Sequence, residues 1–181
     1  MKTHYKEIDF RADWMRDLFS SLNHGFKNIQ EKLNDLEYFD GVFAQEQAET
    51  IYGIAFVTAQ TYITGTVADM SEIGSNLNLK KAEMLSIGSP KVDNETSKIL
   101  LINTIANYYK HYDEWDGWKI ERHNKRTIEI LNKCGISEKT QYPCHEAARI
   151  IWPTEVLCEL NYLLKVLVEW RKDLLHHVKN T

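Results

Sequence analysis

The stretch IYGIAFVTAQTYITGTV, residues 51–67, constrains the fold most strongly, because it is apolar or small on nearly every side of a helical projection. A helix at a protein surface keeps one polar face, whereas a helix that is apolar all round must be surrounded by other elements. The threonines in its second half suit helix or strand, but the sequence offers no second strand to pair with it. We therefore expect a helix over about 42–73 at the middle of a helical bundle.

Helical periodicity also marks the segments before and after this stretch. Residues 9–39 place apolar side chains at three- and four-residue intervals, which predicts a long helix with one core-facing side: Trp14, Leu18, Leu22, Phe26, Ile29, Leu33 and Leu36. Asp9, Asp13 and Asp17 lie one turn apart on another side, as on a solvated face. Further helices are expected within residues 96–115, 125–135 and 136–153. A last helix is expected from Thr154, as its N-cap, to about Val178. The connection 71–96 is expected to hold one short helix. The sequence predicts an all-α fold, a single-domain bundle of about five to seven helices over residues 1–181.

Charge and composition narrow the classes of function. The formal net charge of -4 argues against general coating of nucleic acid, although it leaves room for a local RNA site. No apolar run reaches the roughly 18 residues of a membrane span, and the start MKTHYKEIDF has no signal-peptide core. The three cysteines form no close pair, which is typical of reduced thiols and favours a cytoplasmic protein.

An arginine interrupts the apolar stripe of the last predicted helix. In RKDLLHHVK, residues 171–179, Arg171 lies near the centre of the stripe formed by Val156, Leu160, Leu164, Leu167, Leu174 and Val178. Burial of an unpaired charge costs on the order of several kcal/mol. Arg171 must therefore pair with a carboxylate, cap carbonyl groups, or face a cleft or subunit interface.

The spacing from Arg171 to His176 or His177 resembles the motif of the HEPN superfamily, an arginine followed by four to six residues and a histidine. The resemblance implies a helical bundle that is commonly dimeric, and a metal-independent endoribonuclease or RNase-derived domain of phage defence or toxin–antitoxin systems. A neutral histidine would take the proton of the ribose 2′-hydroxyl, and the arginine would bind the scissile phosphate, without cofactor or metal. Because Arg171 and His177 diverge by about 120° on one helix, the site would form where two copies of the helix meet.

A second polar stripe lies in NYYKHYDEW, residues 107–115. Asn103, Asn107, Lys110, His111 and Glu114 share one helical face, and the spacing of Asn107 and His111 is similar to a variant of the same HEPN motif. Trp115 and Trp118 adjoin the basic positions Lys119, Arg122, His123, Lys125 and Arg126, a combination that suits single-stranded RNA. His111 is the catalytic candidate of this stripe, and the substrate-binding candidates are Asn107, Lys110, Arg122 and Arg126. The alternative is a solvated polar face beside an aromatic loop.

Two other classes of function stay open at this point. The polar stripes could bind a protein partner in a non-catalytic helical interaction module. Alternatively, the acidic pairs Glu46/Glu49 and Asp69/Glu72 resemble those of MazG-like magnesium-dependent nucleotide pyrophosphohydrolases, and would converge only if the helix broke near Gly65. A zinc site is not expected, because the spacing of Cys134, Cys144, His145 and Cys158 fits no standard ligand pattern.

Overall fold

The computed structural model of the chain describes residues 9–35, 39–75, 77–153 and 159–181. These ranges contain seven α-helices, one 3₁₀ helix and no β-strand, so the predicted all-α bundle is confirmed. The helices are α1 (Phe10–Asp35), α2 (Gly41–Ile73), α3 (Lys81–Met84), α4 (Lys98–His111), η1 (Tyr112–Glu114), α5 (Lys125–Lys133), α6 (Pro143–Ile151) and α7 (Asn161–Asn180).

Helix α2 is the centre of the fold, as its composition predicts. It packs against α1, α4, α6 and α7, and Tyr52, Phe56 and Ile63 on it are fully buried. Asp40 caps the start of this helix, because its Oδ1 accepts hydrogen bonds from the backbone amides of Val42 and Phe43 at 2.9 and 3.1 Å. Gly53 lies in the middle of α2 where the Tyr109 ring of α4 lies against the helix backbone, a close approach that the lack of a side chain permits.

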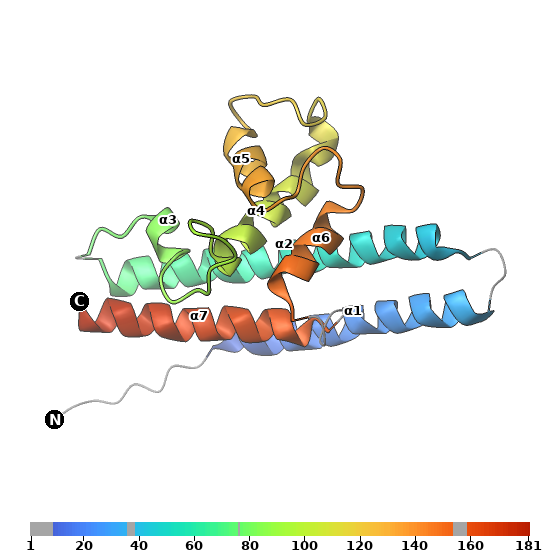
Figure 1. Cartoon of the computed structure of the whole chain (residues 1–181). Coiled ribbons are helices and arrows are strands. Elements are labelled where there is room, and N and C mark those ends of the chain that lie inside the picture. Colours follow the sequence, from blue (N-terminus) through green and yellow to red (C-terminus); the bar gives the residue numbers. More distant parts are fainter. Residues whose placement is uncertain (1–8, 36–38, 76, 154–158) are drawn as a thin grey trace.

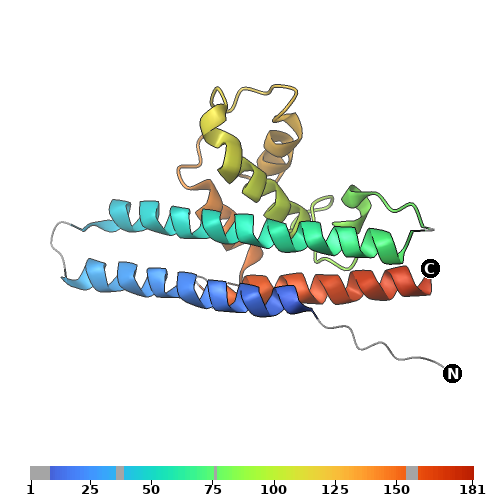
Figure 2. The same cartoon turned by 180° about the vertical axis from the view of Figure 1, so that it is seen from behind.

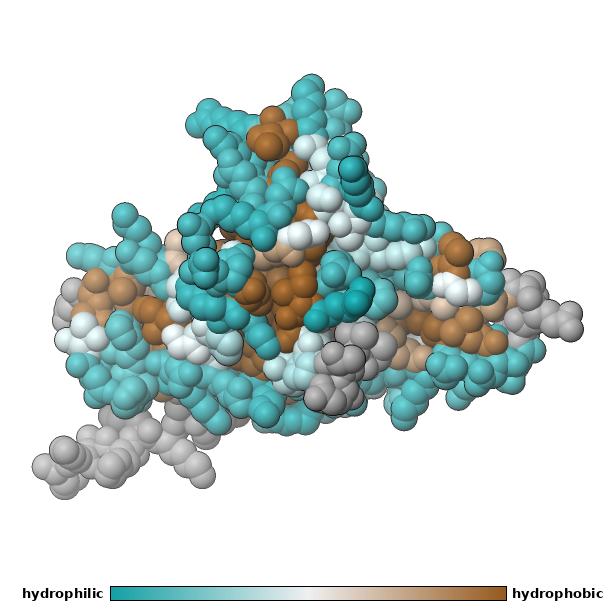
Figure 3. Space-filling model, in the orientation of Figure 1, coloured by the Kyte–Doolittle hydropathy of each residue, from teal (hydrophilic) through white to brown (hydrophobic). Residues whose placement is uncertain are grey.

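Helices α1 and α7 lie along one side of α2, and α4, α5 and α6 lie on its other side, where α4 and α6 pack against it (Figure 1). The view from behind shows the same arrangement of three long helices (Figure 2). Hydrophilic residues cover most of the outer end of the part built by α4 and α5, whereas apolar residues are visible along the long helices (Figure 3). No helix within the described ranges is both long enough and apolar enough to cross a membrane.

The side of α1 that faces the core differs from the predicted one. Trp14 is 75% exposed and Leu18 is 42% exposed, while Met15 and Phe19, one position further along, are buried against α2 and α7. Helical periodicity shows which side chains share a face, but the choice of face depends on the partner helices. Ile29 of the predicted stripe is buried as expected. Leu36, the last position of that stripe, lies outside the described residues.

Helix α7 begins later than the sequence suggests. The predicted cap at Thr154 and the stripe residue Val156 lie outside the described residues, and the described helix starts at Asn161 after a turn at Leu160. The remainder of the stripe is buried as predicted, with Leu167, Leu174 and Val178 in the core. The interruption of this apolar stripe by Arg171 is therefore a property of the packed interior.

Candidate functional site

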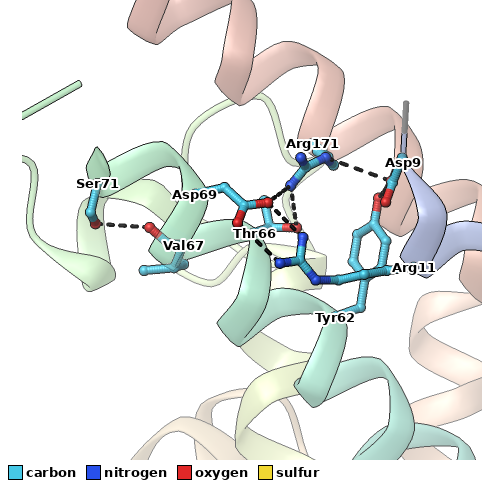
Figure 4. Close-up of polar contacts among 8 residues, drawn as sticks. All are labelled: Asp9, Arg11, Tyr62, Thr66, Val67, Asp69, Ser71 and Arg171. Atoms are coloured by element: carbon cyan, nitrogen blue, oxygen red, sulfur yellow. Dashed lines mark hydrogen bonds and ion pairs between the residues drawn. The ribbon is translucent and has the colours of Figure 1, made fainter. Parts of the chain in front are cut away.

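Arg171 is buried in a network of charged side chains where α7 crosses α2 and the start of α1 (Figure 4). Its Nη1 lies 2.9 Å from Asp69 Oδ2 and donates a hydrogen bond to Thr66 Oγ1 at 3.2 Å. Its Nε lies 3.6 Å from Asp9 Oδ2. The side chain is only 8% exposed. Of the three alternatives that the sequence left open for Arg171, the structure shows the first, pairing with carboxylates.

Arg11 completes this network from α1. Its Nη1 and Nη2 donate to the two oxygens of Asp69 at 2.5 and 3.0 Å, a bidentate geometry that is the strongest form of this pair. The Tyr62 hydroxyl donates to Asp9, so Asp9 belongs to the network and not to the solvated face that the sequence suggested. The hydrogen bond from Arg11 holds the pKa of Asp69 below its usual value, and a smaller contribution comes from Arg171. Asp69 is thus shared by two guanidinium groups, and together with Asp9 it balances their two charges.

The histidines of the last helix lie apart from Arg171. His176 and His177 are exposed, whereas Arg171 is buried on the side of α7 that faces α2. His176 lies beside Asn180, whose Nδ2 is 3.0 Å from the imidazole ring. Within one chain, the arginine and the histidines of the HEPN-like spacing are therefore not brought together.

The α4 stripe, in contrast, is organised by a buried amide on α2. Gln60 Nε2 donates to Asn103 O at 3.0 Å, and lies 2.8 Å from Asn107 Oδ1 and 3.3 Å from Asn103 Oδ1. A backbone carbonyl can only accept, so the amide group of Gln60 must present its NH₂ here, and both asparagines must present oxygen to it. The NH₂ groups of Asn103 and Asn107 are left to point away from Gln60 as donors.

A pocket of about 240 Å³ opens next to these asparagines, between α3, α4 and α5. Its polar lining comes from Asn103, Asn107 and the cationic side chains Lys81 and Arg126, together with Thr104 and Thr127. No carboxylate is among its lining residues. The structure thus brings together two of the predicted substrate-binding residues, Asn107 and Arg126.

The remaining candidates of the second stripe, Lys110, His111 and Arg122, are exposed and do not line this pocket. Lys110 and Arg122 are exposed, and neither forms an ion pair with any of the described residues. His111 is also exposed, and its Nδ1 lies 3.2 Å from Glu114 Oε2. Lys110 and His111 follow Asn107 by one helical turn, so these three polar side chains share the C-terminal half of one face of α4.

Aromatic rings form the border of this surface, as the sequence suggested. Tyr108 stacks on Trp118 with 5.6 Å between ring centroids and meets Trp115 edge-on at 5.8 Å. Burial raises the pKa of the Tyr108 hydroxyl well above its ordinary value, so it stays protonated at any physiological pH. Tyr112 lies against Tyr108 on the outer side and is 43% exposed. The cluster therefore supports the loop between α4 and α5 and leaves one ring face open to solvent.

The acidic residues of the nucleotide-hydrolase alternative do not converge. Helix α2 continues through Gly65, which separates Glu49 from Asp69 by roughly 30 Å at about 1.5 Å per residue. Glu49 instead accepts hydrogen bonds from the backbone amides of Cys144 and His145 at the start of α6, at 2.8 Å each. In the described part of the chain, no three histidine, cysteine, aspartate or glutamate side chains are grouped as metal ligands.

The cysteines that the structure describes do not form a reactive site. Cys144 is buried and Cys134 is half-buried, and both are free thiols. Burial raises the pKa of the Cys134 thiol to about 11 and that of Cys144 well above its usual value. Cys158 lies outside the described residues.

The sequence analysis missed Gln60, Lys81 and Thr127 among the residues of the α4 site. Gln60 carried a signal that could have revealed it, since it is the single amide of the apolar stretch 51–67 and such a group must find a hydrogen-bond partner. Comparison with protein-family models, curated proteins and solved structures found no match to this chain.

Proposed function

We propose that the chain is a HEPN-like, RNase-derived domain that binds single-stranded RNA on the surface of α4 and the loop before α5. The observation that carries the proposal is that Arg126 lines a pocket with the asparagine pair of α4, while the exposed Lys110 and His111 continue the same helical face one turn further on. Lys110, Arg122 and Arg126 form no ion pair within the described ranges, so their charges are available to phosphates. The partly exposed rings of Trp115 and Trp118 offer surfaces on which a base can stack.

In this proposal Arg171 has a structural role. Its guanidinium group is almost wholly buried and is held by Asp69, Asp9 and Thr66. It would have to leave these three partners before it could bind a scissile phosphate. His111 is exposed and has the chemistry of a general base. If the chain cleaves RNA without metal, we therefore assign the proton transfer to His111 and not to His176 or His177.

Binding of a fluorescent single-stranded RNA, followed by anisotropy at several salt concentrations, tests the RNA proposal. We expect Arg122→Gln and Lys110→Gln each to weaken binding about threefold to tenfold and to reduce the salt dependence by about one charge. Lys172→Gln is the matched control, because it removes one exposed charge from α7, whereas the pocket lies between α3, α4 and α5, and we expect less than about twofold change. Equal losses in all three variants would contradict the assignment of the surface.

Cleavage of RNA in EDTA tests the catalytic part separately. The comparison is wild type, His111→Ala, Arg171→Ala and a His176/His177 double alanine variant, each shown to be folded by circular dichroism. Cleavage lost only in His111→Ala supports our assignment. Cleavage lost only in the variants of α7 would return the site to the last helix, and binding without any cleavage would define an RNase-derived binding domain.

A second candidate function, a non-catalytic protein-interaction module, is favoured by a different observation. Phe10, Trp14 and Leu18 follow one another at one-turn intervals along α1 and are 66%, 75% and 42% exposed. An apolar stripe of this kind is typical of protein contacts. Analytical ultracentrifugation tests self-association through it: a dimer that becomes a monomer in Trp14→Arg supports this function, and a wild-type monomer argues against a homodimer.

A further inference from the structure

The pocket between α3, α4 and α5 has a polar side made of amide groups, hydroxyl groups and two cations, and an apolar side made of Ala82, Leu85, Leu100 and Ile130. The amide groups of Asn103 and Asn107 have their oxygens committed to Gln60, so each offers its NH₂ group to the pocket. Lys81 and Arg126 contribute two positive charges, and no lining residue is acidic. A cavity that offers donors and two cations, without a carboxylate, suits an anion rich in acceptor oxygens.

Asn103 shows that this lining is a feature of the packed structure and not of a mobile surface. The residue is 9% exposed, and its NH₂ group has no hydrogen-bond partner among the described residues. Because this nitrogen is reached from the cavity, a ligand in the pocket that offers acceptor oxygens can accept a hydrogen bond from it. Gln60 orients this side-chain amide through the contact of its Nε2 with Asn103 Oδ1 at 3.3 Å.

We propose that this pocket binds the phosphate of a phosphomonoester. A phosphomonoester carries about −1.5 to −2 charges at neutral pH, which matches the two cations, whereas a phosphodiester carries a single charge. At about 240 Å³ the pocket is smaller than the roughly 300–1,000 Å³ of sites that enclose drug-sized ligands. The phosphate and the atoms next to it enter, and the rest of the ligand extends past Arg126 and Lys81, which are exposed.

This inference goes beyond the RNA-binding proposal, because it stands on the pocket lining alone. The phosphate could belong to a free sugar phosphate or to the terminal phosphate of an RNA strand, since both present the same dianion. Arg126 lies in the pocket, whereas Arg122 belongs only to the outer surface. Arg126 therefore bears on both proposals, whereas Arg122 bears on RNA binding alone and separates them.

Isothermal titration of the full chain with ribose 5-phosphate, inorganic phosphate and dimethyl phosphate tests the inference. We expect ribose 5-phosphate to bind at least about tenfold more tightly than the diester, and to lose affinity as the pH falls through about 6, where the second phosphate proton returns. Arg126→Gln should weaken it about tenfold, as loss of a charge-assisted hydrogen bond does. Arg122→Gln, with the same loss of charge, should change it less than about twofold.

Asn107→Asp provides a nearly isosteric variant, in which the oxygen that faces Gln60 is kept and the donor in the pocket becomes an anion. We expect this variant, once shown to be folded, to bind no ribose 5-phosphate.

Titration with a short RNA, with and without a 5′-phosphate, distinguishes the sources of the phosphate group: a gain in affinity that requires both the 5′-phosphate and Arg126 identifies an RNA end. Failure of folded wild type to bind ribose 5-phosphate or inorganic phosphate at millimolar concentration would overturn the inference, as would equal effects of Arg122→Gln and Arg126→Gln. Because RNA anisotropy reports on Arg122 independently, either proposal can fail while the other holds.

Discussion

Replacement of Asp69 by asparagine should be the most damaging conservative change in the buried network, since Asp69 is the carboxylate shared by two guanidinium groups. Arg171, with a side chain only 8% exposed, would keep Thr66 and the longer 3.6 Å contact to Asp9. Removal of one partner of a buried ion pair costs about 3–5 kcal/mol. Asp69 is 28% exposed and Arg11 is 42% exposed, so solvent lowers this figure, and we expect a loss of about 2–3 kcal/mol.

Arg171→Met should cost less, although it removes the more deeply buried group. Asp69 would keep its bidentate pair with Arg11, and the methionine would fill much of the space of the lost stem. We expect a loss of about 1–2 kcal/mol, the contribution of one hydrogen bond to a charged group after repacking. Asp13→Asn is the control, since Asp13 pairs with Arg16 at 2.6 Å on the exposed surface, where such a pair adds little.

Urea unfolding followed by far-UV circular dichroism gives the free energy of unfolding for these variants. The expected order of destabilisation is Asp69→Asn, then Arg171→Met, then Asp13→Asn. The reasoning is refuted if Arg171→Met is more destabilising than Asp69→Asn, because Arg171 would then be the centre of the network. It is refuted equally if Asp69→Asn behaves like the surface control.

Three further predictions concern the packing and titration of the fold. The guanidinium hydrogen bond lowers the pKa of Asp69 in the folded chain. The contribution of Asp69 to stability is therefore complete above its unfolded pKa of about 3.9 and is lost as the pH falls through its folded pKa. Urea midpoints at several acidic pH values should fall more steeply in wild type than in Asp69→Asn. Gly53→Ala would place a Cβ 2.1 Å from the Tyr109 ring and should cost about 1–3 kcal/mol in urea unfolding, whereas Gly41→Ala, with no neighbour within 4 Å, should not destabilise the chain. Cys144, whose burial keeps its thiol protonated, should react with a thiol reagent only in denaturant when the other two cysteines are serine.

The sequence predicts the fold well where one pattern dominates a long segment. Helix α2 is apolar all round and is the centre of the bundle, because no other position in an all-α fold satisfies such a helix. On α1 the periodicity is equally clear, yet Met15 and Phe19 face the core in place of Trp14 and Leu18. Two faces of that helix are apolar, and only the positions of α2 and α7 decide which of them is covered.

The charged residues are harder to predict, since their partners lie far away in the sequence. The isolated Arg171 correctly predicted a buried partner, but Asp69 is 102 positions earlier and looked like one of a pair of metal ligands, while Asp9 looked solvated. On α4, the one-turn spacing of Asn107, Lys110 and His111 predicted a shared face. The pocket beside it depends on Gln60 and on the placement of α3 and α5, which no local pattern shows.

Photochemical cross-linking of a 4-thiouridine RNA to the full chain, with the linked peptides located by mass spectrometry, tests the central claim most directly, because it asks which surface touches RNA without any mutation. We predict cross-links within residues 108–126, on the C-terminal end of α4 and the loop that leads into α5. Cross-links confined to residues 171–177, or none at protein concentrations that saturate a control RNA-binding protein, would contradict the assignment of RNA binding to α4.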